Sequence, residues 1–143
     1  MSIRSSAGVA LDVCLASLKF HPAYAGPAIR FRRYAPLMSK RAIRFRVFAG
    51  AWLEEHLPVT QNHESLTPPH GALFSAPAVD DLGVDRVWLA RPDSKRRAHS
   101  AFANGLAAHC KRTDPQVVQL LNLSPWMAAG LKKLRNAGFP VVF

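Results

Sequence analysis

Apolar runs alternate with basic, helix-like segments along the chain. Residues 9–17 and 43–48 are apolar runs that enclose a helical segment ending near residue 41. Residues 117–123 and 141–143 enclose a second helical segment in the same way. Each set predicts a β-α-β unit, and right-handed crossovers of this kind build a parallel sheet with helices on both faces. The sequence therefore predicts a Rossmann-like α/β fold with a mostly parallel sheet.

The patterns inside two of these runs predict different places in the sheet. Residues 9–17 are small or apolar except for Asp12, which is typical of a strand buried on both faces. In residues 43–48 the apolar positions alternate with Arg44 and Arg46. A strand of this kind has one wetter face, so we expect it away from the centre of the sheet.

Two helices are expected before residue 112. The first should begin at Pro27, because the missing N–H of proline costs nothing at a first helical position. Pro36 inside it predicts a kink or a short first half. The second helix is expected over residues 95–111, after a strand over residues 84–90. Its apolar stripe consists of Ala98, Phe102, Leu106 and Cys110.

The third helix has the clearest boundary signals. Ser124 is an N-cap candidate, Pro125 stands at the first helical position, and Gly138 is expected to close the helix in a left-handed conformation. Trp126 is expected in the core, with packing on the face of a sugar as the alternative. The stripe expected to be buried consists of Met127, Leu131, Leu134 and Ala137.

Length and composition predict one domain over residues 1–143, with 49% hydrophobic residues. Residues 51–79 are rich in proline and lack periodicity, so a long loop region is expected there. The last apolar run, residues 141–143, begins a core strand and stops. We therefore expect the chain to be a fragment of a longer domain.

Two cysteines, Cys14 and Cys110, support neither a disulfide framework nor a zinc site. A reducing, cytoplasmic compartment is expected, with both thiols buried and reduced. The histidines show no spacing that would converge on a metal, and no phosphate-loop motif is present. No metal is expected. No apolar run approaches the roughly 20 residues that a bilayer span needs.

The formal net charge is +10, and it is concentrated in the first part of the chain. Residues 1–50 contain nine Lys and Arg but a single acidic residue. This charge is compatible with an anionic partner, which could be membrane lipid, nucleic acid or a phosphorylated substrate. A mitochondrial leader is excluded, because the segment contains a strand-like run and a proline turn. Arg30, Arg32 and Arg33 could face a lipid surface, an acceptor phosphate or water, and water is slightly favoured.

Two blocks of short motifs follow one another in a recognisable order. The first is a strand, Phe20-His-Pro-x-x-x-Gly26, an arginine-containing helix with Tyr34-Ala-Pro-Leu37, Arg41 and the strand Phe45-Arg-Val47. The second is Asp114-Pro-x-Val-Val118, Leu123-Ser-Pro-Trp126, Leu131-x-x-Leu134 and Gly138-x-Pro-Val-Val142. In order and spacing they resemble the amino-terminal domain of glycosyltransferase family 4.

The resemblance implies the GT-B architecture of two facing Rossmann-like domains, of which this chain would be the incomplete acceptor-side domain. The whole enzyme, a hexosyltransferase, would transfer a sugar from a nucleotide-sugar donor to a glycan, a lipid-linked or a small-molecule acceptor. The fragment alone would be inactive. The nucleotide sugar is then a substrate, and no cofactor is expected. The resemblance is also compatible with peripheral contact between the enzyme and the inner face of an anionic membrane. No specific nucleic acid is expected as a partner.

The resemblance also implies substrate-binding residues on two loops after strands: His21, Gly26, Arg30, Asn122 and Ser124. A glycine after the first strand lets donor phosphates approach backbone amides. Simpler alternatives are a plain turn at Gly26, an incidental loop position for His21 and helix capping by Ser124. The chain departs from the family at Ala25, which replaces one glycine of a pair, and at Gln119 and Leu121, where relatives often carry histidines. Catalytic residues are therefore not assigned.

The rival hypothesis is a small basic Rossmann-like module that binds nucleic acid. It explains the charge, but the chain lacks interleaved aromatic residues and any recognisable nucleic-acid motif. A salt titration separates the two hypotheses. Affinity for nucleic acid that falls steeply with salt favours the rival, and absence of binding removes it.

Overall fold

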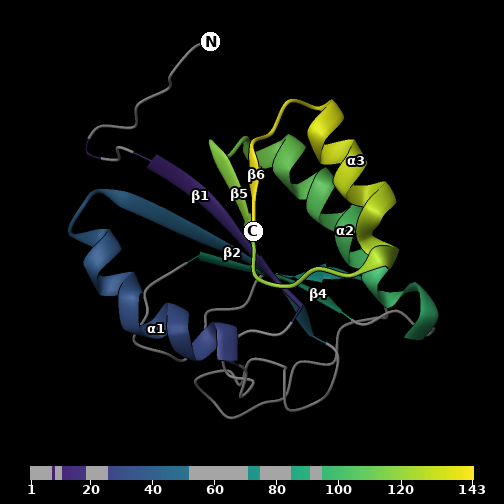
Figure 1. Cartoon of the computed structure of the whole chain (residues 1–143), viewed down its shortest axis with the longest axis horizontal. Helices are drawn as coiled ribbons and strands as arrows, with labels where there is room; N and C mark the ends of the chain where they lie inside the picture. Colours follow the sequence, from purple (N-terminus) through teal and green to yellow (C-terminus); the bar gives the residue numbers. More distant parts are fainter. Residues whose placement is uncertain (1–7, 9–10, 19–25, 52–70, 75–84, 91–94) are drawn as a thin grey trace.

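The computed structural model describes residues 8, 11–18, 26–51, 71–74, 85–90 and 95–143 (Figure 1). Its strands are β1 (Leu11–Ser17), β2 (Ile43–Ala51), β3 (Leu73–Phe74), β4 (Asp85–Ala90), β5 (Val117–Leu120) and β6 (Val141–Val142). Its helices are α1 (Gly26–Ser39), α2 (Lys95–Thr113), the short 3₁₀ helix η2 (Pro125–Met127) and α3 (Ala128–Asn136). The short strand β3 lies within residues 51–79, where a loop was expected, and most of that segment lies outside the described residues.

The strands form one sheet in the order β3-β4-β2-β1-β5-β6. Only the edge strand β3 is antiparallel to its neighbour among the described strands, and all other pairs are parallel. The prediction of a mostly parallel α/β sheet is therefore confirmed. Counted along the chain, the parallel strands lie in the order third, second, first, fourth and fifth, which is the Rossmann order.

The helices cover both faces of the sheet, as expected (Figure 1). On one face α1 packs Phe31 and Ala35 against Val13, Leu15 and Phe45, and other strand residues complete this cluster. Phe31 and Phe45 meet edge to face with ring centroids 5.0 Å apart. Helix α1 continues through Pro36 to Ser39 without interruption, so the predicted short first half is wrong.

On the other face α2 and α3 cover the sheet together. The predicted stripe of α2, residues Ala98, Phe102, Leu106 and Cys110, is buried in full. In the last helix Met127 and Leu134 are buried and Leu131 is half-buried, but Ala137 is exposed because α3 has ended at Asn136. Gly138 has the expected left-handed φ of 87°.

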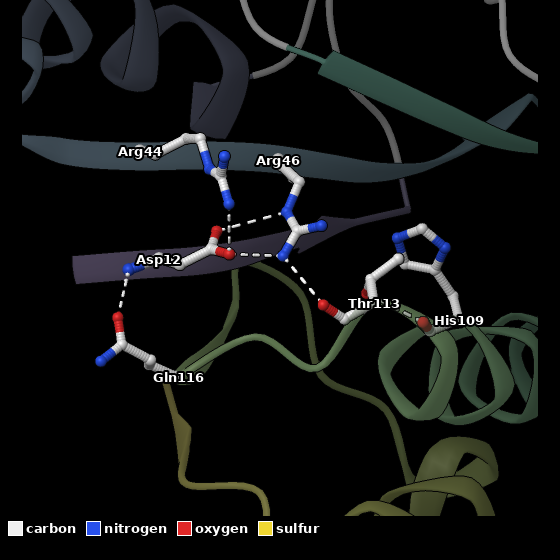
Figure 2. A network of polar contacts seen from close by, with 6 residues as sticks. All are labelled: Asp12, Arg44, Arg46, His109, Thr113 and Gln116. Carbon is white, nitrogen blue, oxygen red and sulfur yellow. Dashed lines mark hydrogen bonds and ion pairs between the residues drawn. The ribbon is translucent and has the colours of Figure 1, made fainter. Parts of the chain in front are cut away.

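The expectation that residues 43–48 lie away from the sheet centre is wrong, because β2 lies between β1 and β4. Its two arginines are paired with Asp12 of β1 (Figure 2). Arg44 Nη2 lies 2.8 Å from Asp12 Oδ2, and Arg46 binds the same carboxylate through Nε and Nη2. Arg46 also donates to the carbonyl of Thr113 at the end of α2, at 3.1 Å. Pairing with Asp12, together with the partial exposure of both guanidinium groups, lets an arginine-bearing strand lie between two other strands of the sheet.

Both cysteines are buried and free, as the sequence predicts. They are remote in sequence but adjacent in the fold, and a hydrogen bond joins their side chains. This hydrogen bond and burial raise the pKa of the Cys14 thiol well above its ordinary value. A thiol held in the protonated form is a poor nucleophile, so Cys14 acts as a core residue.

Candidate functional site at the switch point of the sheet

The strand order reverses between β1 and β5, because the chain passes from β1 to β2 on one side and returns to β5 on the other. In open sheets of this class, ligands bind outside the carboxyl ends of the strands at such a switch point. The pairing of β1 and β5 extends past Leu120, since Leu121 N donates to Ala16 O at 2.9 Å. Residues 17–18, 122 and 124 therefore line the place where a ligand is expected.

Asn122 joins the ends of the two strands. Its Oδ1 accepts hydrogen bonds from Ser17 Oγ at 3.0 Å and from Leu18 N at 2.9 Å. The backbone N–H of Leu18 needs an acceptor, so the orientation of the amide is fixed. Within the described ranges, Asn122 Nδ2 has no acceptor. The sequence-predicted residue Asn122 thus presents an oriented donor at the switch point.

Ser124 lies at the N-cap position of η2, but its side chain makes no capping hydrogen bond. Its Oγ is instead 2.7 Å from Nδ1 of His99, in the second turn of α2. The capping role expected for this hydroxyl is therefore wrong. The contact ties the loop after β5 to α2 and fixes both polar groups beside the switch point.

Trp126 is 66% exposed, so its expected place in the core is wrong. In η2 the neighbouring Met127 is the residue that points inward and is fully buried. The indole ring of Trp126 contacts the ring of His99 nearly at right angles, with centroids 5.5 Å apart. Leu123 on the same loop is 61% exposed. An aromatic ring and an aliphatic side chain thus stand in solvent next to the polar groups.

The remaining sequence-predicted residues lie at the start of α1 or outside the described chain. Gly26 is the first residue of α1, which begins at the end of the sheet where β1 ends (Figure 1). It is exposed, its φ lies outside the left-handed region, and among the described residues no atom beyond its chain neighbours and its own helix backbone lies within 4 Å of the Cβ that a substitution would add. Arg30 is exposed one turn further along α1. His21 lies outside the described residues.

Ser17 and His99 were not assigned to the site from the sequence, and Trp126 was expected in the core, with packing on the face of a sugar as the alternative. Ser17 and Asn122 are 105 residues apart, and His99 and Ser124 are 25 residues apart, so no local pattern links them. One signal was present for His99. It lies near the beginning of a helix that follows a strand, and such helices begin at the carboxyl end of a parallel sheet.

The site is rich in hydrogen-bonding groups. Hydroxyl groups, one amide and one imidazole surround the ends of β1 and β5, beside the exposed indole. No cluster of three His, Cys, Asp or Glu able to hold a metal is found among the described residues. No helix in the described part of the chain is long and apolar enough to cross a membrane. The arrangement suits a ligand with several hydroxyl groups more than a multiply charged one.

Comparisons with protein-family models, curated proteins and solved structures find no match to this chain.

Proposed function

We propose that the chain is the acceptor-side, amino-terminal domain of a glycosyltransferase similar to family 4. The intact enzyme transfers a sugar from a nucleotide-sugar donor to a glycan, a lipid-linked or a small-molecule acceptor. The observation that carries the proposal is the switch point between β1 and β5, where Asn122 and Ser124 bring neutral hydrogen-bonding groups together. Their places coincide with two of the positions that the resemblance assigns to substrate.

The first turn of α1 supports a role for Gly26 next to the donor. Its exposed position at the start of the helix leaves backbone N–H groups of the first turn without helical acceptors. Such groups attract phosphate, and the dipole of the helix adds to the attraction. Arg30 adds a positive charge one turn later. In this proposal the donor diphosphate binds at α1 and the acceptor binds at the loop after β5, with no metal ion.

Transfer is tested with the complete gene product, incubated with UDP-glucose, UDP-N-acetylglucosamine or GDP-mannose. Membrane lipid extract and soluble oligosaccharides serve as acceptors, and release of the nucleoside diphosphate is measured. We expect one donor to be consumed in an acceptor-dependent way. Absence of acceptor-dependent release from all three donors would contradict the proposal.

Replacing Gly26 by Val should reduce transfer by about tenfold or more, a loss of about 1.4 kcal/mol of transition-state stabilisation. A β-branched side chain at this position keeps a phosphate away from the backbone amides. Folding should change little, because no described atom beyond its chain neighbours and its own helix backbone lies within 4 Å of the new Cβ. Steady-state kinetics and urea unfolding of Gly26→Val, with Gly26→Ala as the smaller control, check both statements. Normal turnover of a folded Gly26→Val enzyme would show that Gly26 only begins a helix.

We also propose that α1 holds the enzyme at the inner, cytoplasmic face of an anionic membrane. Arg33 and Leu37 lie one helical turn apart on one exposed face of α1, and Leu37 is 58% exposed. No acidic residue is present in α1. Basic residues near an anionic surface contribute about 1 kcal/mol each, and an apolar side chain among them can enter the interface.

Sedimentation with phosphatidylglycerol vesicles should therefore capture the protein, and neutral phosphatidylcholine vesicles should not. The double substitution Arg33→Gln, Leu37→Ser should release most of it. Arg135→Gln, which removes an exposed charge from α3 on the opposite face of the sheet, should leave binding unchanged. Equal loss in both variants would indicate an effect of net charge alone and would refute a docking role for α1.

A further inference from the structure

Trp126 combines high exposure with a fixed position. Two thirds of its surface is in solvent, although an indole is among the side chains most stabilised by burial. The residue is not on a free loop. The next residue, Met127, is fully buried, and its N–H donates to Ser124 O at 3.1 Å. The backbone on which the indole stands is therefore anchored in the core on its carboxyl side.

The orientation of the indole is fixed as well. His99 contacts it at an interplanar angle of 80°, and the imidazole is itself held by Ser124 Oγ at 2.7 Å. Trp126 and Ser124 belong to the same short segment, whereas His99 comes from α2. A closed set of contacts between two elements thus holds an exposed aromatic ring in one orientation. A prepositioned ring loses little conformational entropy when a ligand binds.

The surroundings of the ring indicate which chemistry would cover it. A pyranose ring offers an apolar face of C–H groups and a rim of hydroxyl groups. The face of an aromatic ring is electron-rich and attracts such C–H groups. Hydroxyl groups need neutral donors and acceptors at the rim, and the oriented amide of Asn122 and the hydroxyl of Ser124 lie on the same loop. These three side chains carry no charge, so the local group does not favour a phosphate.

We propose that Trp126 is the stacking surface for a pyranose ring of the acceptor, with Asn122 at its rim and His99 as the positioning residue behind it. The assignment rests on the proposed glycosyltransferase function, since it names the acceptor class as a carbohydrate or a glycolipid whose sugar is bound. Leu123, which is also exposed and lies three residues before Trp126 in the chain, has no flat face and contributes little to this recognition.

The test uses protein labelled with 5-fluorotryptophan, in which Trp126→Phe identifies the resonance of Trp126 among the three tryptophans. Soluble trisaccharides of glucose, mannose, galactose and N-acetylglucosamine are titrated in turn. We expect at least one to shift the Trp126 signal saturably and to leave the other two signals in place. Calorimetry should show that Trp126→Ala weakens the binding of this trisaccharide by about tenfold. Trp126→Tyr should retain most of the affinity.

Leu123→Ala is the matched control, since it removes a neighbouring exposed apolar side chain but no ring. Binding within about twofold of wild type supports stacking, because a general apolar docking surface would lose affinity in both variants. The inference is overturned if no trisaccharide shifts the Trp126 signal, if Leu123→Ala weakens binding as much as Trp126→Ala, or if oligothymidylate shifts the signal more than any sugar.

A second measurement separates this inference from the function on which it rests. In the complete gene product, Trp126→Ala should raise the KM for the acceptor and leave the KM for the donor unchanged. An active enzyme whose acceptor KM does not change refutes the stacking role alone. A protein that consumes no donor refutes the proposed function, and the acceptor role of Trp126 with it. His99→Gln should raise the acceptor KM without changing the donor KM, as expected for a residue that acts through Trp126.

Discussion

Replacing Gly130 by Ala should destabilise the protein by about 2 kcal/mol, and Gly130→Val should destabilise it more. Gly130 is buried in α3 where this helix crosses α2. A Cβ at this position would lie 2.5 Å from the carbonyl carbon and from Cβ of Ala103, and 2.8 Å from its carbonyl oxygen. These are mostly backbone atoms of a helix that is itself packed on the sheet, so they cannot yield locally. The helices would have to move apart.

Helix propensity alone would predict that Gly130→Ala stabilises the protein. Gly to Ala inside a helix normally stabilises by up to about 1 kcal/mol. The clash with α2 outweighs this gain, because overpacking a tight contact between helices typically costs 1–3 kcal/mol, occasionally more. Urea unfolding followed by circular dichroism measures the difference, with Gly26→Ala as a helical control in open space. A Gly130→Ala protein as stable as wild type would show that α2 and α3 do not approach this closely.

The separation of α2 and α3 also matters for the candidate site. His99 is on α2, and Trp126 and Ser124 precede α3, so their contacts depend on how the two helices pack. A wider spacing would move the imidazole away from the hydroxyl and the indole. Gly130→Ala, if it folds, should therefore also weaken binding at Trp126, although Gly130 contacts no ligand.

The fold could be predicted from the sequence because the central strands carry a strong signal. Strand β1 is small and apolar on both faces, and its residues from Val13 onwards are buried. The position of β2 could not be predicted in the same way. The alternation with Arg44 and Arg46 indicates a wet face, and only the pairing with Asp12 on the neighbouring strand changes this conclusion. A partner on another strand is invisible to a local pattern.

The candidate site could be predicted only in part, for the same reason. Asn122 and Ser124 were found because they follow an apolar strand, which is a local feature. The contact that orients Ser124 comes from His99 on another helix, and the neighbouring Trp126 is exposed because Met127 takes the buried position in a 3₁₀ turn. The sequence indicates an ordinary capped helix at this point.

At the opposite end of the sheet, His109 should make the stability of the protein depend on pH. It is buried in α2 beside Phe48, with ring centroids 5.2 Å apart, and Arg112 Nη2 donates to its Nδ1 at 3.2 Å. Burial, together with the charges of Arg112 and Arg46, lowers the pKa of His109 to about 4 from the ordinary 6.5. The folded protein therefore holds the imidazole neutral.

The direction of the effect follows from this lowered pKa. Above pH 6.5 the imidazole is neutral in both states, and the contribution of His109 to stability is complete. As the pH falls from 6.5 towards 4, His109 binds a proton in the unfolded chain but not in the folded protein. The free energy of unfolding therefore decreases. We expect the free energy of unfolding to fall by roughly 2 kcal/mol over this interval. This is somewhat less than the full shift of the His109 pKa would give.

His109→Gln isolates this contribution, because glutamine keeps a hydrogen-bond acceptor for Arg112 and does not titrate. The variant should be less stable than wild type at neutral pH, since the ring contact with Phe48 is lost. Its free energy of unfolding should also fall less steeply between pH 7 and pH 4, because the other histidines and the carboxylates titrate equally in both proteins. Urea unfolding at a series of pH values gives the two curves. Parallel curves would mean that His109 is protonated as easily in the folded protein as in the unfolded chain, and that its burial against β2 is not as described.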